Sequence, residues 1–104
     1  MPQWNTPRYA VRATIVEIMG SGKCPAGLVV GDTWVWKWTI PEQMCPWLSY
    51  ALFPFFQALS FGGQIPWEKD RGKARVCCID PASPVVVELE RIEEKVSGAD
   101  TEIK

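Results

Sequence analysis

The segment "KARVCCIDPASPVVVELERI", Lys73 to Ile92, contains two strand-like runs with a turn between them. The runs Lys73–Asp80 and Pro84–Ile92 are rich in β-branched residues, and the turn-forming "PASP" separates them. Two strands joined by so short a connection pair antiparallel. The segment therefore predicts a β-hairpin and, with it, an antiparallel sheet as the basis of the fold.

Two segments earlier in the chain also have the period-two pattern of strands. Tyr9–Ile15 alternates between an apolar face and a mixed face. Thr33–Ile40, "TWVWKWTI", places Trp34, Trp36 and Trp38 on one face of a strand. These two strands are expected to join the hairpin in one sheet.

Between the two strand pairs the sequence predicts a helical segment. Pro46 suits the first helical position, which places Cys45 at or next to the N-cap. Apolar residues then recur at helical spacing, namely Leu48, Leu52, Phe55 and Leu59. Pro54 predicts a kink or a split into two helices, because proline donates no backbone hydrogen bond. Gly62 and Gly63 mark the expected end.

The order strand, strand, helical segment, strand, strand predicts a small α+β domain, with a mainly antiparallel sheet packed on the helical segment. We expect residues 1–92 to form this single domain, since 104 residues suffice for one core. Residues 93–104, "EEKVSGADTEIK", are polar, and we expect a frayed C-terminal tail there. Both an open sheet and a partial barrel are compatible with the pattern.

Composition excludes several classes of function and site. A net charge of −1 provides no field for nucleic acid or anionic lipid, so neither is expected as a partner. The N-terminus lacks the pattern of a secretory signal, and the most apolar stretch is too short for a membrane span. We therefore expect a cytoplasmic protein whose four cysteines are free thiols or metal ligands rather than disulfides. The chain has no histidine, which removes imidazole from catalysis and metal binding.

Strand alternation places the two adjacent cysteines of the hairpin on opposite faces of the strand. Ala74, Val76 and Cys78 share the face expected to point inward, whereas Cys77 lies on the opposite, partly solvated face. Asp80 continues the face of Cys78 if the strand extends that far. Cys78 is therefore the thiol of the pair that is expected to meet the rest of the domain.

The other two cysteines both precede a proline. Cys24 lies in the glycine-rich loop "MGSGKCPAG". Cys45 lies at the predicted helix start, where backbone amides stabilise negative charge and hence a reactive thiolate. No pair of cysteines has the C-x-x-C spacing typical of zinc sites.

Three segments together resemble a family of small, functionally uncharacterised prokaryotic proteins: "CPAGLVVGD", "CPWLSYALFPFFQALSFGGQIPW" and "CIDPASPVVVELERI". Members of that family share the motifs Cys-Pro-x-Gly…Gly-Asp, Cys-Pro…Pro…Gly-Gly and Cys-x-Asp-Pro. The resemblance covers Tyr9 to Ile92 and leaves Cys77 outside the pattern. It implies no particular activity, but it singles out five residues: Cys24, Asp32, Cys45, Cys78 and Asp80.

Three interpretations of Cys24, Cys45 and Cys78 stay open. They are small buried packing residues, or they bind zinc or an iron–sulfur cluster with Asp80 or another ligand completing the shell. Alternatively Cys45 is a reactive thiolate with Cys78 or Cys24 as resolving partner and Asp80 nearby for proton transfer. The last interpretation makes Cys45, Cys78 and Asp80 catalytic in a thiol-dependent redox enzyme or transferase.

The tryptophans Trp34, Trp36 and Trp38 have two interpretations as well. They form core against the helical segment, or they line a partly uncovered face that binds a flat small molecule or a second subunit. The expected function is therefore a cysteine-centred site for a metal ion, a cluster or a small ligand, bordered by these indoles. The competing hypothesis is a non-catalytic interaction or homo-oligomerisation module with structural cysteines.

Overall fold

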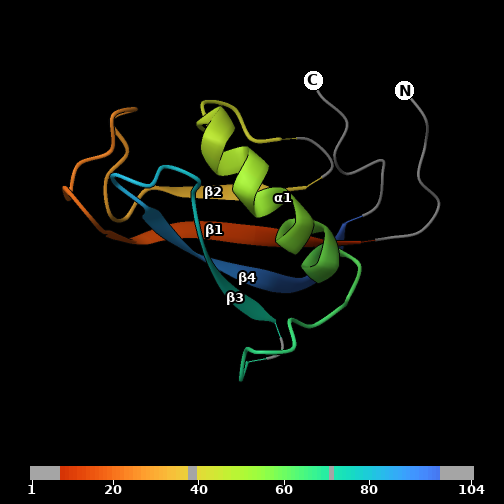
Figure 1. Cartoon of the computed structure of the whole chain (residues 1–104). Helices are drawn as coiled ribbons and strands as arrows, with labels where there is room; N and C mark the ends of the chain where they lie inside the picture. The colour runs from red at the N-terminus through yellow and green to blue at the C-terminus, as the bar shows by residue number, and fades with distance from the viewer. Residues whose placement is uncertain (1–7, 38–39, 71, 97–104) are drawn as a thin grey trace.

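The part of the chain that the structure describes forms one sheet with one helix packed on it. The computed structural model describes residues 8–37, 40–70 and 72–96. Its elements in chain order are β1 (Arg8–Ile18), β2 (Thr33–Trp36), α1 (Pro46–Ser60), β3 (Lys73–Cys77) and β4 (Val85–Val96). The strands pair antiparallel in the order β2-β1-β4-β3, and α1 covers one face of the sheet (Figure 1). The predicted α+β class is confirmed, and β2 and β3 form the two edges of an open sheet.

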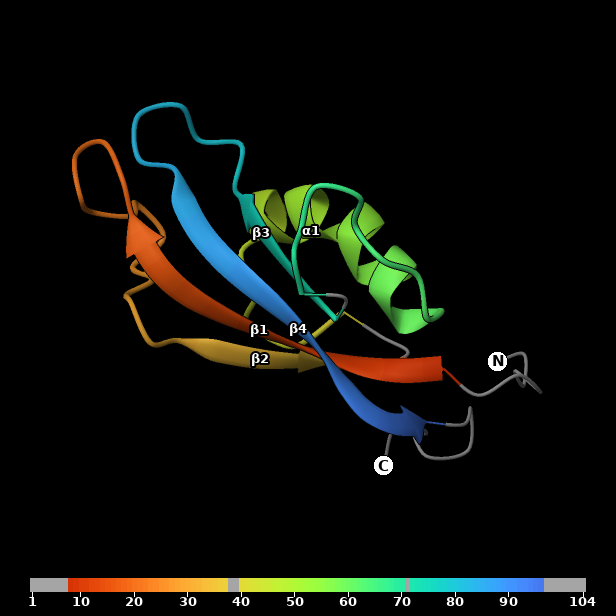
Figure 2. The ribbon, with the colours of Figure 1, turned by 90° about the horizontal axis from the view of Figure 1, so that it is seen from below.

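The long strands β1 and β4 lie side by side in the centre of the sheet and twist together along their whole length (Figure 2). Their register shifts between Tyr9 and Val11 and again between Ile15 and Glu17. Such bulges increase the local twist, which lets the sheet curve around the helix. β4 continues to Val96, so residues 93–96 belong to the sheet and not to the frayed tail that we expected. Residues 97–104 lie outside the described part of the chain.

The two faces of the sheet differ as strand alternation requires. The face away from α1 carries ion pairs between neighbouring strands, with Arg12 Nη1 3.3 Å from Glu90 Oε1 and Arg75 Nε 3.5 Å from Glu88 Oε2. The other face is apolar, and Ala13 and Leu89, which pair across β1 and β4, are fully buried there. The core therefore lies between the sheet and α1.

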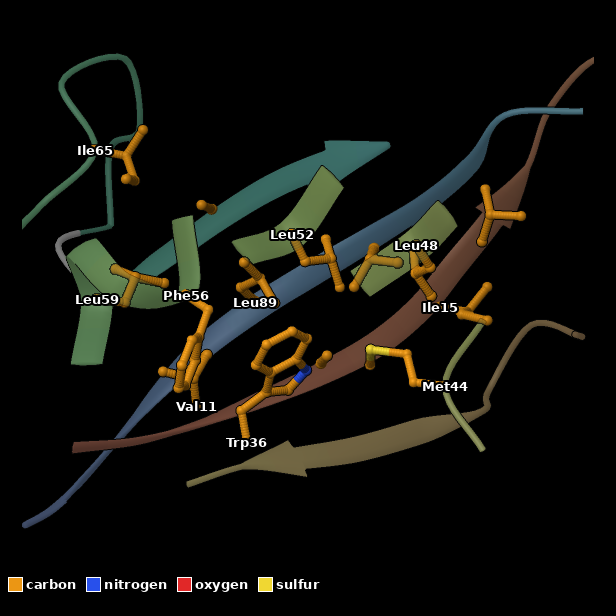
Figure 3. Packing of buried hydrophobic residues seen from close by; sticks show 14 residues of the cluster. Val11, Ile15, Trp36, Met44, Leu48, Leu52, Phe56, Leu59, Ile65 and Leu89 are labelled. Atoms are coloured by element: carbon orange, nitrogen blue, oxygen red, sulfur yellow. The ribbon is translucent and has the colours of Figure 1, made fainter. Parts of the chain in front are cut away.

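The helix buries one apolar side against this core (Figure 3). Leu48, Leu52 and Leu59 are buried as the spacing predicts, but the fourth buried apolar residue of the helix is Phe56 and not Phe55. The Phe56 ring lies 4.5 Å from the Trp36 ring, centroid to centroid, which joins the helix to the edge strand β2.

Pro54 does not divide the helix, because α1 runs unbroken from Pro46 to Ser60. Proline removes the bond to the carbonyl four residues earlier, which is that of Tyr50. Both residues lie on the exposed side of the helix, where water can replace the lost donor. The helix ends as predicted, since Gly62 has φ +89° and donates its amide to the Leu59 carbonyl.

Arg91 of β4 holds the C-terminal end of the helix. Its Nη1 donates hydrogen bonds to the carbonyls of Leu59 (3.1 Å) and Gly63 (2.6 Å), and its guanidinium lies 5.3 Å from the centroid of the Tyr9 ring. A cation is favourable at this place because the carbonyls at a helix C-terminus carry partial negative charge. None of the helical residues that the structure describes forms a segment of the length and apolarity that a membrane crossing requires.

Candidate functional site: a cysteine-lined cavity

A cavity of about 510 Å³ lies at the N-terminal end of α1. Cys24, Cys45 and Cys78, which come from three separate segments of the chain, all line it together with Asp80. Apart from these four residues its lining is apolar, with contributions from Pro25, Ala26, Leu28, Pro46, Trp47, Leu48, Ala82 and Val85. The three cysteines singled out by the sequence thus lie in one wall, whereas Cys77 is exposed and does not line the cavity.

Cys78 follows the last residue of β3 and is held by the hairpin. Its Sγ accepts a hydrogen bond from the Val85 amide at 3.3 Å and is 4.0 Å from the Ser83 carbonyl oxygen, to which the thiol can donate. Its own amide donates to the Val85 carbonyl at 3.0 Å, so the pairing of β3 and β4 continues to this residue. The half-buried thiol is therefore fixed in orientation by the backbone around it.

Cys45 is the N-cap residue of α1, with Pro46 in the first turn as predicted. The Cys45 carbonyl accepts the first helical hydrogen bond, from the Ser49 amide at 2.9 Å, while its side chain makes no capping bond. The amides at the start of a helix have no partners within the helix. The Cys45 thiol consequently lies at the positive end of the helix dipole.

The loop that carries Cys24 is held against the hairpin turn by its backbone. Met19 and Ser21 donate their amides to the carbonyls of Pro84 (2.8 Å) and Ala82 (3.1 Å). At Gly20 the approach is so close that a Cβ atom would come within 2.0 Å of the Ala82 oxygen. This packing of two turns places the part of the cavity wall that contains Cys24 next to the part that contains Cys78.

The two aspartates have structural roles in turns. Asp80 Oδ1 accepts the Ala82 amide at 2.9 Å, and Asp32 Oδ2 accepts the Val29 amide at 3.0 Å. Such bonds to nearby amides are the usual reason for aspartate in a turn. Only Asp80 also lines the cavity, where it is the one carboxylate among the described lining residues. Asp32 lies apart from the site.

Two residues of the predicted tryptophan wall, Trp34 and Trp36, are not among the described residues that line this cavity. Trp36 is 1% exposed and belongs to the core, and Trp34 is half-buried against the same core. Trp38 lies outside the described residues. Sequence alternation correctly grouped Trp34 and Trp36 on one face, and both pack against the core. The buried Trp36 Nε1 has no hydrogen-bond partner among the described residues.

The indole that does line the cavity is Trp47, which we had not proposed as a site residue. It is 54% exposed and stands in the first turn of α1, two residues after Cys45. The sequence contained a signal for this position. Trp47 lies outside the stripe of buried residues that includes Leu48 and Leu52, so its apolar side chain must point away from the core.

The thiols share the cavity wall without meeting at one point. All four cysteines are free, and no group of three or more Cys, Asp or Glu side chains in residues 8–37, 40–70 and 72–96 is arranged to hold a metal ion. Most of the residues that line the cavity are apolar, and the thiols and one carboxylate are its few polar groups.

No protein-family model matches the chain, and neither curated proteins nor solved structures give a significant match. The resemblance to the small prokaryotic family therefore stays a prediction.

Proposed function

We propose that the cysteine-lined cavity is a binding site for a small, mainly apolar organic molecule. Its volume of about 510 Å³ is within the range of about 300–1,000 Å³ common for ligand pockets. Removing the apolar surface of a ligand from water would supply most of the binding free energy. The thiols and the Asp80 carboxylate are the few polar groups that would orient the molecule.

The observation that carries this proposal is the shared wall of Cys24, Cys45 and Cys78. These residues are far apart in the sequence and reach the cavity from a loop, a helix start and a strand end. Cysteines that served only as packing would have no reason to be only half-buried around one opening.

The proposal is tested by titration with N-phenyl-1-naphthylamine, a neutral apolar dye that fluoresces strongly out of water. We expect saturable binding of one dye per chain. Cys45→Phe places a ring in the cavity and should weaken binding about tenfold or more, because it excludes the dye from the space it would fill. Cys77→Phe adds the same ring outside the cavity and should leave binding unchanged. Equal effects of the two variants would place the dye elsewhere.

A second candidate function, self-association, is supported by the outer face of α1. This face, defined here as Trp47, Tyr50 and Phe53, has exposed fractions of 54%, 73% and 48%. The helix contains no charged residue, so two copies could meet through it without repulsion between like charges. Tyr50 and Phe53 also border an open groove of about 660 Å³, which could receive an aromatic side chain of the second copy.

Sedimentation velocity over a range of protein concentrations tests this second function. We expect a dimer that the double variant Tyr50→Lys, Phe53→Lys converts to a monomer, because two like charges would then face each other across the symmetry axis. The matched control is Val29→Lys, Val30→Lys, which places the same charges on exposed apolar residues of the 19–32 loop. A monomer at all concentrations without any substitution would rule out self-association.

A further inference from the structure

We infer that the molecules bound in the cavity are soft electrophiles with an activated double bond, and that Cys45 forms a covalent bond with them. The chemical class is that of α,β-unsaturated carbonyl compounds and imides. This inference rests on the proposed ligand site and adds the reaction that the site performs. It follows from differences between the four thiols in surroundings and exposure.

Cys45 differs from Cys78 in what holds its sulfur. The Cys78 Sγ is engaged by the Val85 amide at 3.3 Å, whereas Cys45 makes no capping bond with its side chain. A thiol without such a bond can turn toward a ligand in the cavity at little cost. Cys24 also lines the cavity, but it lies in a loop and not at the end of a helix.

The start of α1 offers hydrogen-bond donors beside Cys45. Pro46 has no amide hydrogen, and the amides of Trp47 and Leu48 fall in the first turn, where no carbonyl of the helix can accept them. Both residues line the cavity. Amides in this position stabilise a negatively charged oxygen, as the donors of an oxyanion hole do.

These groups together account for a complete addition reaction. The Cys45 thiol gives its proton to water as its sulfur forms a bond to the β-carbon of the electrophile. The π electrons of the double bond move to the carbonyl oxygen, where the amides of Trp47 and Leu48 stabilise the enolate. Water then gives a proton to the α-carbon and the carbonyl re-forms. The net change is addition of S–H across the double bond, with no oxidant or reductant.

Cys77 serves as an internal control for the reactivity of Cys45. It is the exposed cysteine of the chain, so simple accessibility would make it react first. It lies outside the cavity and therefore gains nothing from an apolar group on the reagent. The ratio of modification at Cys45 to that at Cys77 thus measures what the cavity contributes.

The experiment treats the reduced full-length protein with less than one equivalent of N-phenylmaleimide and locates the adduct by peptide mass spectrometry. We expect Cys45 to react about tenfold or more faster than Cys77, since binding raises the local concentration of the reagent. Iodoacetamide, which is small and polar, should show no such preference. Cys45→Ser should abolish the fast reaction, and Cys77→Ser should leave the rate at Cys45 unchanged.

The saturated analogue N-phenylsuccinimide separates failure of this inference from failure of the ligand site. It cannot react, and we expect it to displace the bound dye and to slow labelling of Cys45 but not of Cys77. Preferred labelling of Cys24, Cys77 or Cys78 would overturn the role of Cys45, while displacement of the dye would still support the ligand site. Absence of both selective labelling and dye binding would overturn the two proposals together.

Discussion

The amide of Val85, at the start of β4, donates a hydrogen bond to the sulfur of Cys78 across the hairpin, over 3.3 Å. Val85 is 1% exposed, so its amide depends on this sulfur for a partner. The Cys78 side chain thus completes the hydrogen bonding of the hairpin and also forms part of the cavity wall.

Replacing Cys78 should therefore cost stability even without any ligand. Cys78→Ala removes the acceptor and should lower the free energy of unfolding by about 1–2 kcal/mol, because a buried amide is left unpaired. Cys78→Ser keeps an acceptor and should cost less. Urea unfolding measures both, with Cys77→Ala as the exposed control. If the two alanine variants were equally stable, the bond to Val85 would have no structural role.

The contact between Gly20 and the Ala82 carbonyl should be essential for the shape of the site. Gly20→Ala meets that oxygen and should destabilise the protein by about 3 kcal/mol or more, since backbone must move on both sides. Gly22 has a similar positive φ, +79°, but open space around its Cβ position. Gly22→Ala should therefore show only the conformational cost of about 1 kcal/mol. Thermal or urea unfolding of the two variants measures the stability that depends on this contact. Similar losses of stability in Gly20→Ala and Gly22→Ala would contradict the prediction.

Arg91 should stabilise the fold through the end of α1. Arg91→Met keeps much of the side-chain length but loses the bonds to the Leu59 and Gly63 carbonyls, and we expect a loss of about 2 kcal/mol. Arg75→Met removes a cation from the exposed ion pair with Glu88 and should change stability by less than about 0.5 kcal/mol. Denaturant unfolding distinguishes the two, and the prediction fails if Arg75→Met is the more damaging change.

Substitution of Trp36 should affect mainly stability, whereas substitution of Trp47 should affect mainly ligand binding. Trp36→Ala empties part of the core beside Phe56 and should cost about 3–5 kcal/mol. Trp47→Ala alters an exposed cavity wall, so it should change stability by less than about 1 kcal/mol while weakening N-phenyl-1-naphthylamine binding several-fold. Unfolding and dye titration are measured on both variants. Loss of stability without loss of dye binding at Trp47 would assign it to the core.

Local sequence patterns were sufficient for most of the fold. Pro46, the leucine stripe and the two glycines predicted the helix start and end, because these signals act within a turn or two of the chain. The hairpin pattern likewise placed β3 and β4 with the correct pairing. The choice between Phe55 and Phe56 could not be made locally, since both lie near the buried side and only contact with Trp36 favours Phe56.

Among the cysteines, the sequence by itself distinguished the inward-facing Cys78 from Cys77 and placed Cys45 at the helix start, because alternation along a strand and the position of a helix N-cap are local properties. Only the tertiary structure decided that three of them line one cavity, that their neighbour there is Trp47, and that Trp36 is core. Trp36 is core because it packs against Phe56, whereas the shared cavity depends on the loop that carries Cys24 packing against the hairpin turn at Gly20. That contact joins backbone atoms distant in sequence, and no short-range pattern encodes the separation between them.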